Sequence, residues 1–166
     1  MAVLIRGRSV TANSWRPLEG EARHWLSVRE DGLVPDFPAE GDLVVPLVVW
    51  QLRRDDLLLR QGRAGVRLEP HEDPAELAAD AARLALVEVS FPKFGDGRGF
   101  SIARLLRGRY GYGGELRAVG QVTREHLHFM AQCGFDAFLL RDGEDAAEAL
   151  AAFGELSAGY HGRRAA

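Results

Sequence analysis

The chain has 166 residues, of which 46% are hydrophobic and 27% are charged, and its formal net charge at pH 7 is −3. This composition predicts one soluble domain with its own core, and the negative charge argues against a nucleic-acid-binding protein, for which a basic face is expected. No apolar run reaches the roughly 18 residues of a membrane span. The single cysteine, Cys133, excludes an internal disulfide and fits a reducing compartment, so the expected location is cytoplasmic.

The first forty residues differ from the rest of the chain. The stretch VLIRGRSVTANSW predicts a small hairpin, and LVPDFPAEGD predicts a proline-containing loop. We expect a single domain 1–166, in which 1–41 form an N-terminal hairpin and loop cap, 42–157 form the core and 158–166 form a tail.

From Asp42 onward, apolar runs alternate with helical patterns. Asp73 followed by Pro74 is a strong helix start, and Gly134 suits the position just after a helix end. The predicted strands are Leu43–Gln51, Ala64–Glu69, Leu84–Phe91, Glu115–Val119 and Phe135–Leu140. The predicted helices are Arg53–Gln61, the segment 74–84, Ser101–Arg107, Arg124–Cys133 and Glu144–Leu156.

This alternation predicts an α/β fold of five βα units with a mostly parallel sheet and a small N-terminal β extension. The pattern does not decide between an open doubly wound sheet and a partial barrel. In both, ligands bind beyond the carboxyl ends of the strands. Those ends are predicted near Trp50, Glu69, Lys93, Gln121 and Arg141.

The stretch Phe91–Gly120 contains eight of the nineteen glycines. Between Phe91 and Arg117, six basic residues face two acidic ones, so this window carries +4 in a chain of −3. A glycine-rich, basic loop that opens a helix is typical of an anion site, because helix-start amides and guanidinium groups both bind oxyanions. The expected anion-binding residues are Lys93, Gly97, Arg98, Gly99, Ser101 and Arg104.

The alternative is that these glycines serve backbone turns and that the arginines are solvated or paired. Asp96 and Lys93 are weak candidates for an acid/base role, since an aspartate before a glycine is more often a turn residue. A candidate partner surface comprises Arg107, Arg109, Tyr110 and Tyr112.

Cofactor motifs are not recognisable. The spacing of Gly95, Gly97 and Gly99 does not fit G-x-G-x-x-G, and no Gly-Lys-Ser/Thr follows. His126 and His128 are two apart on a predicted helix and point to nearly opposite sides, so no metal site is expected.

The run FPKFGDGRGFSIARLLRGRYGYGGELRAVGQV, followed by MAQCGFDAFLL, resembles the bacterial "domain of unknown function 934" family. The resemblance extends upstream to Val44–Trp50 and downstream to Tyr160. The positions that carry it are Phe94, Asp96, Gly97, Arg98, Gly99, Ser101, Arg104, Gly114, Glu115, Arg117 and Gly120. No catalytic roles are transferred by this match.

The resemblance implies a role in assimilatory sulfite reduction, because family members are described as oxidoreductases of that process and tend to be encoded beside sirohaem sulfite reductase. Since the chain shows no electron-carrier motif, we expect an accessory protein that acts with the reductase and binds a sulfite- or sulfate-like oxyanion at the loop 93–104. The alternative is an oxidoreductase, or another βα enzyme, that uses an unrecognised cofactor mode. A membrane partner is not expected, and a homo-oligomer is left open.

Overall fold

A single eight-stranded sheet organises the chain in the computed structural model, which describes residues 2–93 and 95–154. The strand order is β2-β1-β8-β7-β6-β5-β4-β3. Strands β3 to β8 are parallel to one another, and β1 pairs antiparallel with both β2 and β8. The strands are β1 Leu4–Arg6, β2 Ser9–Thr11, β3 Trp15–Pro17, β4 Asp42–Pro46, β5 Ala64–Leu68, β6 Leu86–Phe91, β7 Glu115–Gly120 and β8 Ala137–Leu139.

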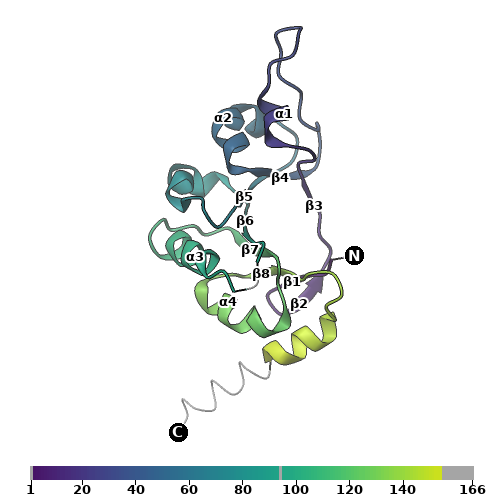
Figure 1. The fold of residues 1–166 in the computed structure, drawn as a ribbon, viewed down its shortest axis with the longest axis vertical. Coiled ribbons are helices and arrows are strands. Elements are labelled where there is room, and N and C mark those ends of the chain that lie inside the picture. The colour runs from purple at the N-terminus through teal and green to yellow at the C-terminus, as the bar shows by residue number, and fades with distance from the viewer. Residues whose placement is uncertain (1, 94, 155–166) are drawn as a thin grey trace.

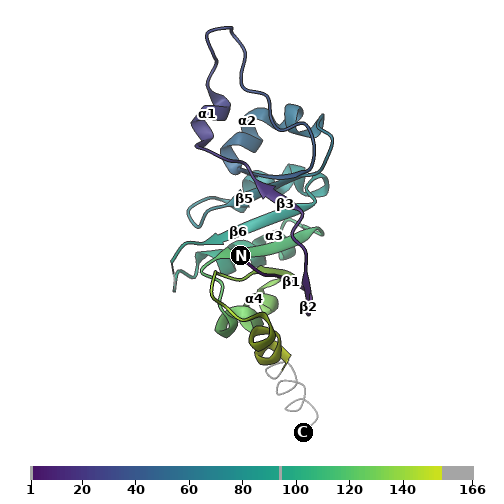
Figure 2. The ribbon, with the colours of Figure 1, turned by 90° about the vertical axis from the view of Figure 1, so that its right-hand side faces the viewer.

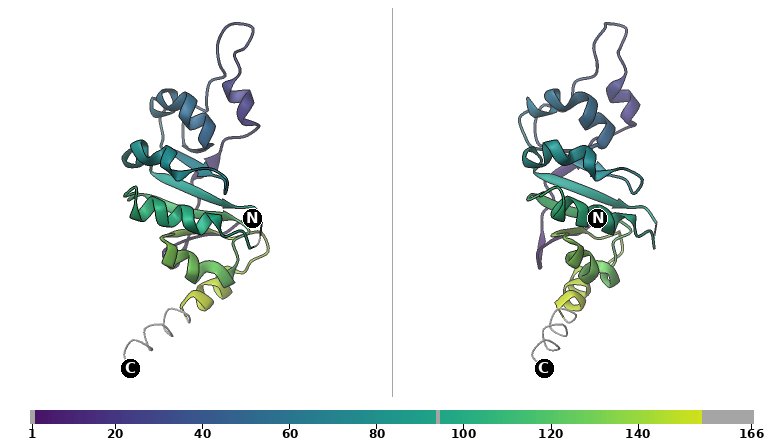
Figure 3. Two further views of the ribbon diagram at one scale, coloured as in Figure 1. Left: turned by 60° about the vertical axis from the view of Figure 1, so that its left-hand side comes forward. Right: turned by 90° about the vertical axis from the view of Figure 1, so that its left-hand side faces the viewer.

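The helices between the strands lie in one layer on one face of the sheet (Figures 1 and 3). They are α1 Ala22–Leu26, α2 Leu47–Leu58, the 3₁₀ helix η1 Pro74–Arg83, α3 Arg98–Gly108, the short 3₁₀ turn η2 Arg124–His126 and α4 Leu127–Cys133. Strands β4 to β8 follow one another in space as they do in sequence, so each right-handed crossover returns to the same face. The sheet is therefore a curled half-barrel and not a doubly wound sheet (Figure 1).

The mostly parallel α/β architecture is confirmed, while the count of five βα units stays a prediction. Strands β4, β5, β6 and β7 each lead into a helical segment. The fifth predicted helix, Glu144–Leu156, is helical at 146–154 and begins two residues later than predicted; residues 155 and 156 lie outside the described residues, as does the predicted tail.

The predicted strand Leu43–Gln51 is wrong in its second half. The strand β4 ends at Pro46, which is the N-cap of α2. Proline has no N–H to continue the strand ladder, and its fixed φ suits a helix start, so the apolar run changes from strand to helix there. Trp50 consequently lies inside α2 and not at a strand end. It is fully buried, and its Nε1 donates to Asp80 at 3.0 Å.

The N-terminal hairpin is confirmed, with Ile5 opposite Val10 at the β8 edge of the sheet. The pattern did not predict β3, which pairs with β4 at the opposite edge. Residues 12–14 connect these two edges and cross the face of the sheet that has no helices (Figure 2). We call this face the concave face and residues 12–14 the strap.

Alternate strand residues form the main core against the helices. Val66, Val87, Val89 and Leu116 are inaccessible to solvent and pack there with Trp50. None of the described helices is long and apolar enough to cross a membrane.

Candidate functional site

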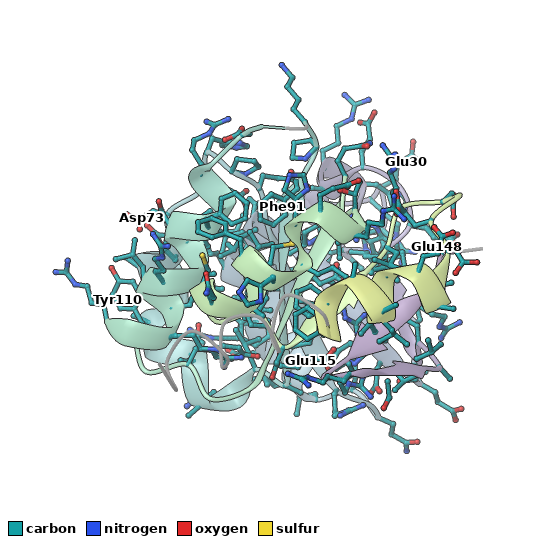
Figure 4. The ribbon with its side chains drawn as sticks, turned by 90° about the horizontal axis from the view of Figure 1, so that it is seen from below. Glu30, Asp73, Phe91, Tyr110, Glu115 and Glu148 are labelled. Atoms are coloured by element: carbon teal, nitrogen blue, oxygen red, sulfur yellow. The ribbon has the colours of Figure 1, made fainter. Side chains whose placement is uncertain are left out.

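The carboxyl ends of β6 and β7 lie side by side. The glycine-rich loop therefore lies at the end of the sheet where the parallel strands finish, which we call its carboxyl edge. Gln121 N donates to Phe91 O at 2.7 Å. Gly120 has φ 95°, and a Cβ there would stand 2.6 Å from Phe91 O, so only glycine fits this close approach. Figure 4 labels Phe91 before the loop and Tyr110 beyond the far end of α3.

Asp96 organises the start of α3. Its Oδ1 accepts from Arg98 N at 3.1 Å, and its Oδ2 accepts from Arg98 Nη2 at 2.7 Å. Hydrogen bonds from Arg98, with the nearby charge of Lys93, lower the pKa of Asp96 to about 2. The carboxylate therefore occupies the position that an external anion would take, and the partner guanidinium is 61% exposed to solvent.

A small cavity of about 60 Å³ lies beside this ion pair. Its polar lining comes from Lys93, Asp96, Gln121 and His126, and its apolar lining from Phe91, Phe100 and Met130. Thr123 Oγ1 lies 3.0 Å from His126 Nδ1, which fixes the orientation of the imidazole ring. Three titratable side chains, two from the loop after β6 and one from η2, thus line the same small cavity.

A second hollow, of about 430 Å³, adjoins the first through Gln121. It lies over the ends of β7 and β8 and includes Arg141. The Nε of Arg141 donates to Glu144 at 3.3 Å, and its Nη1 donates to Gln121 Oε1 at 3.5 Å. We call the two hollows together the carboxyl-edge site.

The remaining residues predicted to bind an anion are spread along α3. Gly97 is the exposed N-cap of α3. Gly99 is buried against the Phe91 ring, and a Cβ on Gly99 would stand 2.6 Å from the nearest ring atoms. Ser101 is exposed on the first turn. Arg104 lies towards α4, with its guanidinium carbon 5.5 Å from the Phe129 ring centroid. Lys93 and Arg98 are therefore the two predicted cations at the loop, while Arg104 lies one helix turn or more away.

The four residues of the predicted partner surface divide into two pairs. Arg107 donates to Gly134 O, Tyr112 O and Gly114 O at 2.7–2.9 Å, so it joins α3 to the chain around β7. Tyr112 is buried, its hydroxyl lies 3.0 Å from Glu115 O, and burial raises its pKa. Arg109 is exposed, with its guanidinium 5.9 Å from the half-buried Tyr110 ring.

An ion ladder on the concave face, buried at its centre and open to solvent at both ends, was missed by the sequence analysis. It runs across the strands in the order Arg67, Glu88, Arg117, Glu115 and Arg6. Arg67 Nη2 lies 2.8 Å from Glu88 Oε2, and Arg117 Nη2 lies 2.8 Å from Glu115 Oε1. Arg117 is completely buried, and its Nη1 donates to Asn13 Oδ1 of the strap at 3.1 Å.

The signal for this ladder is present in the sequence. The strands AGVRL, LVEVSF and ELRAVG each carry a charge on the face opposite their main apolar residues. In the parallel register Arg67 pairs with Glu88, and Glu88 with Arg117, so opposite charges face each other across neighbouring strands.

A larger hollow, of about 570 Å³, lies elsewhere, between α2 and the loop that follows α1. Its cations already bind backbone carbonyls: Arg53 Nη1 donates to Pro35 O at 2.6 Å, and Arg60 Nε donates to Pro38 O at 2.6 Å. These contacts hold the loop on α2. We therefore favour the smaller carboxyl-edge site, where titratable groups converge and the cations contact side chains.

Within residues 2–93 and 95–154, no three His, Cys, Asp or Glu side chains are grouped to hold a metal ion. Burial raises the pKa of the Cys133 thiol, an effect that the nearby Arg104 opposes.

The profile of a family described as "Bacterial protein of unknown function (DUF934)" matches residues 65–166, which is more than half of the chain. The match begins in β5 and includes both the carboxyl-edge loop and the strands of the ion ladder from Arg67 to Glu115. The upstream resemblance at Val44–Trp50 lies outside it. Among curated proteins, none matches the chain.

Proposed function

This chain belongs to the DUF934 family of bacterial proteins, and we propose that it is an accessory protein of assimilatory sulfite reduction. In this proposal it acts in the cytoplasm with sirohaem sulfite reductase and binds a sulfite- or sulfate-like oxyanion at the carboxyl-edge site. The observation that carries the oxyanion assignment is the placement of Lys93 and Arg98, both exposed, at the sheet edge where parallel α/β folds bind ligands.

Asp96 sets the condition for binding. An arriving oxyanion replaces the Asp96 carboxylate on Arg98 N and on the Arg98 guanidinium, since both donors now bind that carboxylate. The two anions have the same hydrogen-bonding needs, so the exchange conserves charge-assisted contacts. Lys93 supplies a second positive charge next to the displaced group.

Titration calorimetry with sulfite and with sulfate tests the oxyanion site. Arg98→Ala removes a charge-assisted donor to the anion, so we expect roughly 10- to 100-fold weaker binding. Asp96→Asn removes the competing anion, and we expect tighter binding than in the wild type. Arg109→Ala, which removes an exposed cation beyond the other end of α3, is the matched control and is expected to bind normally.

Equal affinities in all three variants would overturn the oxyanion assignment. The pathway assignment is tested separately by deleting the gene and measuring growth with sulfite as the sulfur source. Unchanged growth of the deletion strain contradicts it.

An enzyme that uses the same site is the second candidate, and the shared cavity of Lys93, Asp96 and His126 favours it. These are acid/base side chains within one small space, as proton transfer requires. A bound chromophore in the absorption spectrum of the purified protein would support the oxidoreductase form of this candidate.

A further inference from the structure

The outward face of α3 carries positive charge without any negative charge. The helix Arg98–Gly108 contains three arginines and no acidic residue. Arg104 and Arg109 are both exposed, the first on the α4 side and the second just beyond the helix end. Arg107, in contrast, is half-buried and held by backbone carbonyls.

Two apolar side chains stand next to these cations. Phe129, from α4, is 43% exposed, and Leu105 is 37% exposed. Phe129 is not loose, because its ring packs edge-to-face on Phe100 with centroids 4.8 Å apart, and the Arg104 guanidinium lies 5.5 Å from it. We call Arg104, Leu105, Arg109 and Phe129 the α3 face.

This combination is typical of a protein–protein contact. Aromatic and arginine side chains are enriched in the parts of interfaces that contribute most binding energy, and a pre-ordered aromatic ring loses little entropy on binding. A bare cationic surface for a polyanion does not need the exposed apolar side chains.

The distribution of charge selects the chemistry of the partner. The window Phe91–Arg117 is +4 and the whole chain is −3, so the rest of the chain is −7. The acidic remainder of the chain repels an extended polyanion, such as nucleic acid or an anionic membrane. Such a partner is larger than the basic face and therefore also approaches the acidic surface around it. A compact acidic patch on a folded protein contacts only the basic part.

We propose that the α3 face docks an acidic surface patch of the sulfite reductase, with an apolar side chain of the reductase seated between Phe129 and Leu105. This inference rests on the proposed function. The face lies on the same helix as Arg98, whose backbone N donates to Asp96, so a partner that covers the exposed side of α3 approaches the oxyanion site from the far end of that helix.

The test is the affinity of the full-length protein for purified sirohaem sulfite reductase of the same organism, measured by calorimetry at low and high ionic strength. Arg104→Glu with Arg109→Glu reverses the charge of the face, and we expect at least about tenfold weaker binding. The matched control is Arg23→Glu with Arg29→Glu, which makes the same charge change on exposed residues of α1 and its following loop. The control is expected to bind as the wild type does, and Phe129→Ala is expected to weaken binding at both salt concentrations.

Sulfite titration of every variant, run in parallel, separates the possible failures. A folded face variant that binds the reductase normally overturns the α3 face and leaves the accessory role intact. A wild type that binds sulfite but not the reductase overturns the partnership and, with it, the docking proposal. Tighter binding to anionic vesicles, to an oligonucleotide or to a second copy of the chain than to the reductase also overturns it.

Discussion

The concave face and the carboxyl-edge loop use arginine in opposite ways. Arg117 is completely buried, contacts two glutamates, and is covered by Asn13 of the strap. Arg98 is 61% exposed and pairs with a carboxylate two residues away. Both positions belong to the motif by which the sequence resembles its family, so membership in a motif does not distinguish a structural residue from a binding residue.

A cluster of basic residues in a sequence therefore mixes charges that the fold uses internally with charges that it presents to solvent. Arg107 and Arg117 contribute to the +4 charge of the loop region, yet their charge is used internally. Lys93, Arg98, Arg104 and Arg109 are exposed and present their charge to solvent. Only this second group can bind an external anion or an acidic partner.

The largest expected difference in stability is between the variants Arg117→Leu, on the concave face, and Arg98→Leu, at the carboxyl-edge loop. Arg117→Leu leaves buried carboxylates without their shared partner, which costs about 3 kcal/mol or more. We expect a loss of about 3 kcal/mol, because Glu88 still pairs with Arg67 and Glu115 still pairs with Arg6 in this variant. The melting temperature should fall by roughly 6–12 °C in calorimetry. Arg98→Leu should leave the melting temperature nearly unchanged, because an exposed ion pair contributes little to stability. Equal losses in the two variants would contradict the comparison.

Two glycines of the loop allow a sharper comparison at an intermediate size of effect. A Cβ at Gly99 would stand 2.6 Å from the Phe91 ring, which packs against Phe100 and Phe135, whereas a Cβ at Gly97 meets no atom within 4 Å. Gly99→Ala should destabilise the protein by about 1–3 kcal/mol through overpacking. Gly97→Ala, at a negative φ, should be neutral or slightly stabilising. Urea unfolding midpoints measure both, and a neutral Gly99→Ala would show that the ring moves aside freely.

Much of the fold could be predicted because its signals are local. Gly134 ends α4 with φ 115°, and Asp73 Oδ1 accepts from Ala75 N at 2.9 Å, as expected from their types and positions. The strand β3 and the strap could not be predicted in this way. Trp15 pairs with Asp42, and Asn13 reaches Arg117, so their structure depends on residues far along the chain.

The position of the glycine-rich loop in the fold could be predicted, but the contacts of its side chains could not. The alternation of strands and helices puts Lys93 at the carboxyl edge whatever the strand order, so the loop is found there. The pairing of Arg98 with Asp96 and the inward role of Arg107 depend on which way each side chain turns. Arg107 contacts Gly134, which is 27 residues away, and no local pattern contains that information.

Acid titration should give the smallest effect and test whether exposed ion pairs contribute to folding at all. Hydrogen bonds from Arg63 lower the pKa of Asp42 from 3.8 to about 2, and the same carboxylate accepts from Arg63 N at the start of β5. A carboxyl group whose pKa is lower in the folded state contributes stability above its unfolded pKa and loses that contribution as the pH falls. The loss attributable to Asp42 therefore lies between about pH 4 and about pH 2.

We expect Asp42→Asn to flatten the dependence of the unfolding free energy on pH in that window, measured by urea unfolding at a series of pH values. Its stability should be closer to the wild type at the acid end than at neutral pH, because the wild type has by then lost the ion pair. A variant whose pH profile runs parallel to that of the wild type would show that the ion pair between Asp42 and Arg63 does not contribute to the unfolding free energy. Stabilising ion pairs would then be expected only where both charges are shielded from solvent, as they are between Arg117 and Glu88 on the concave face.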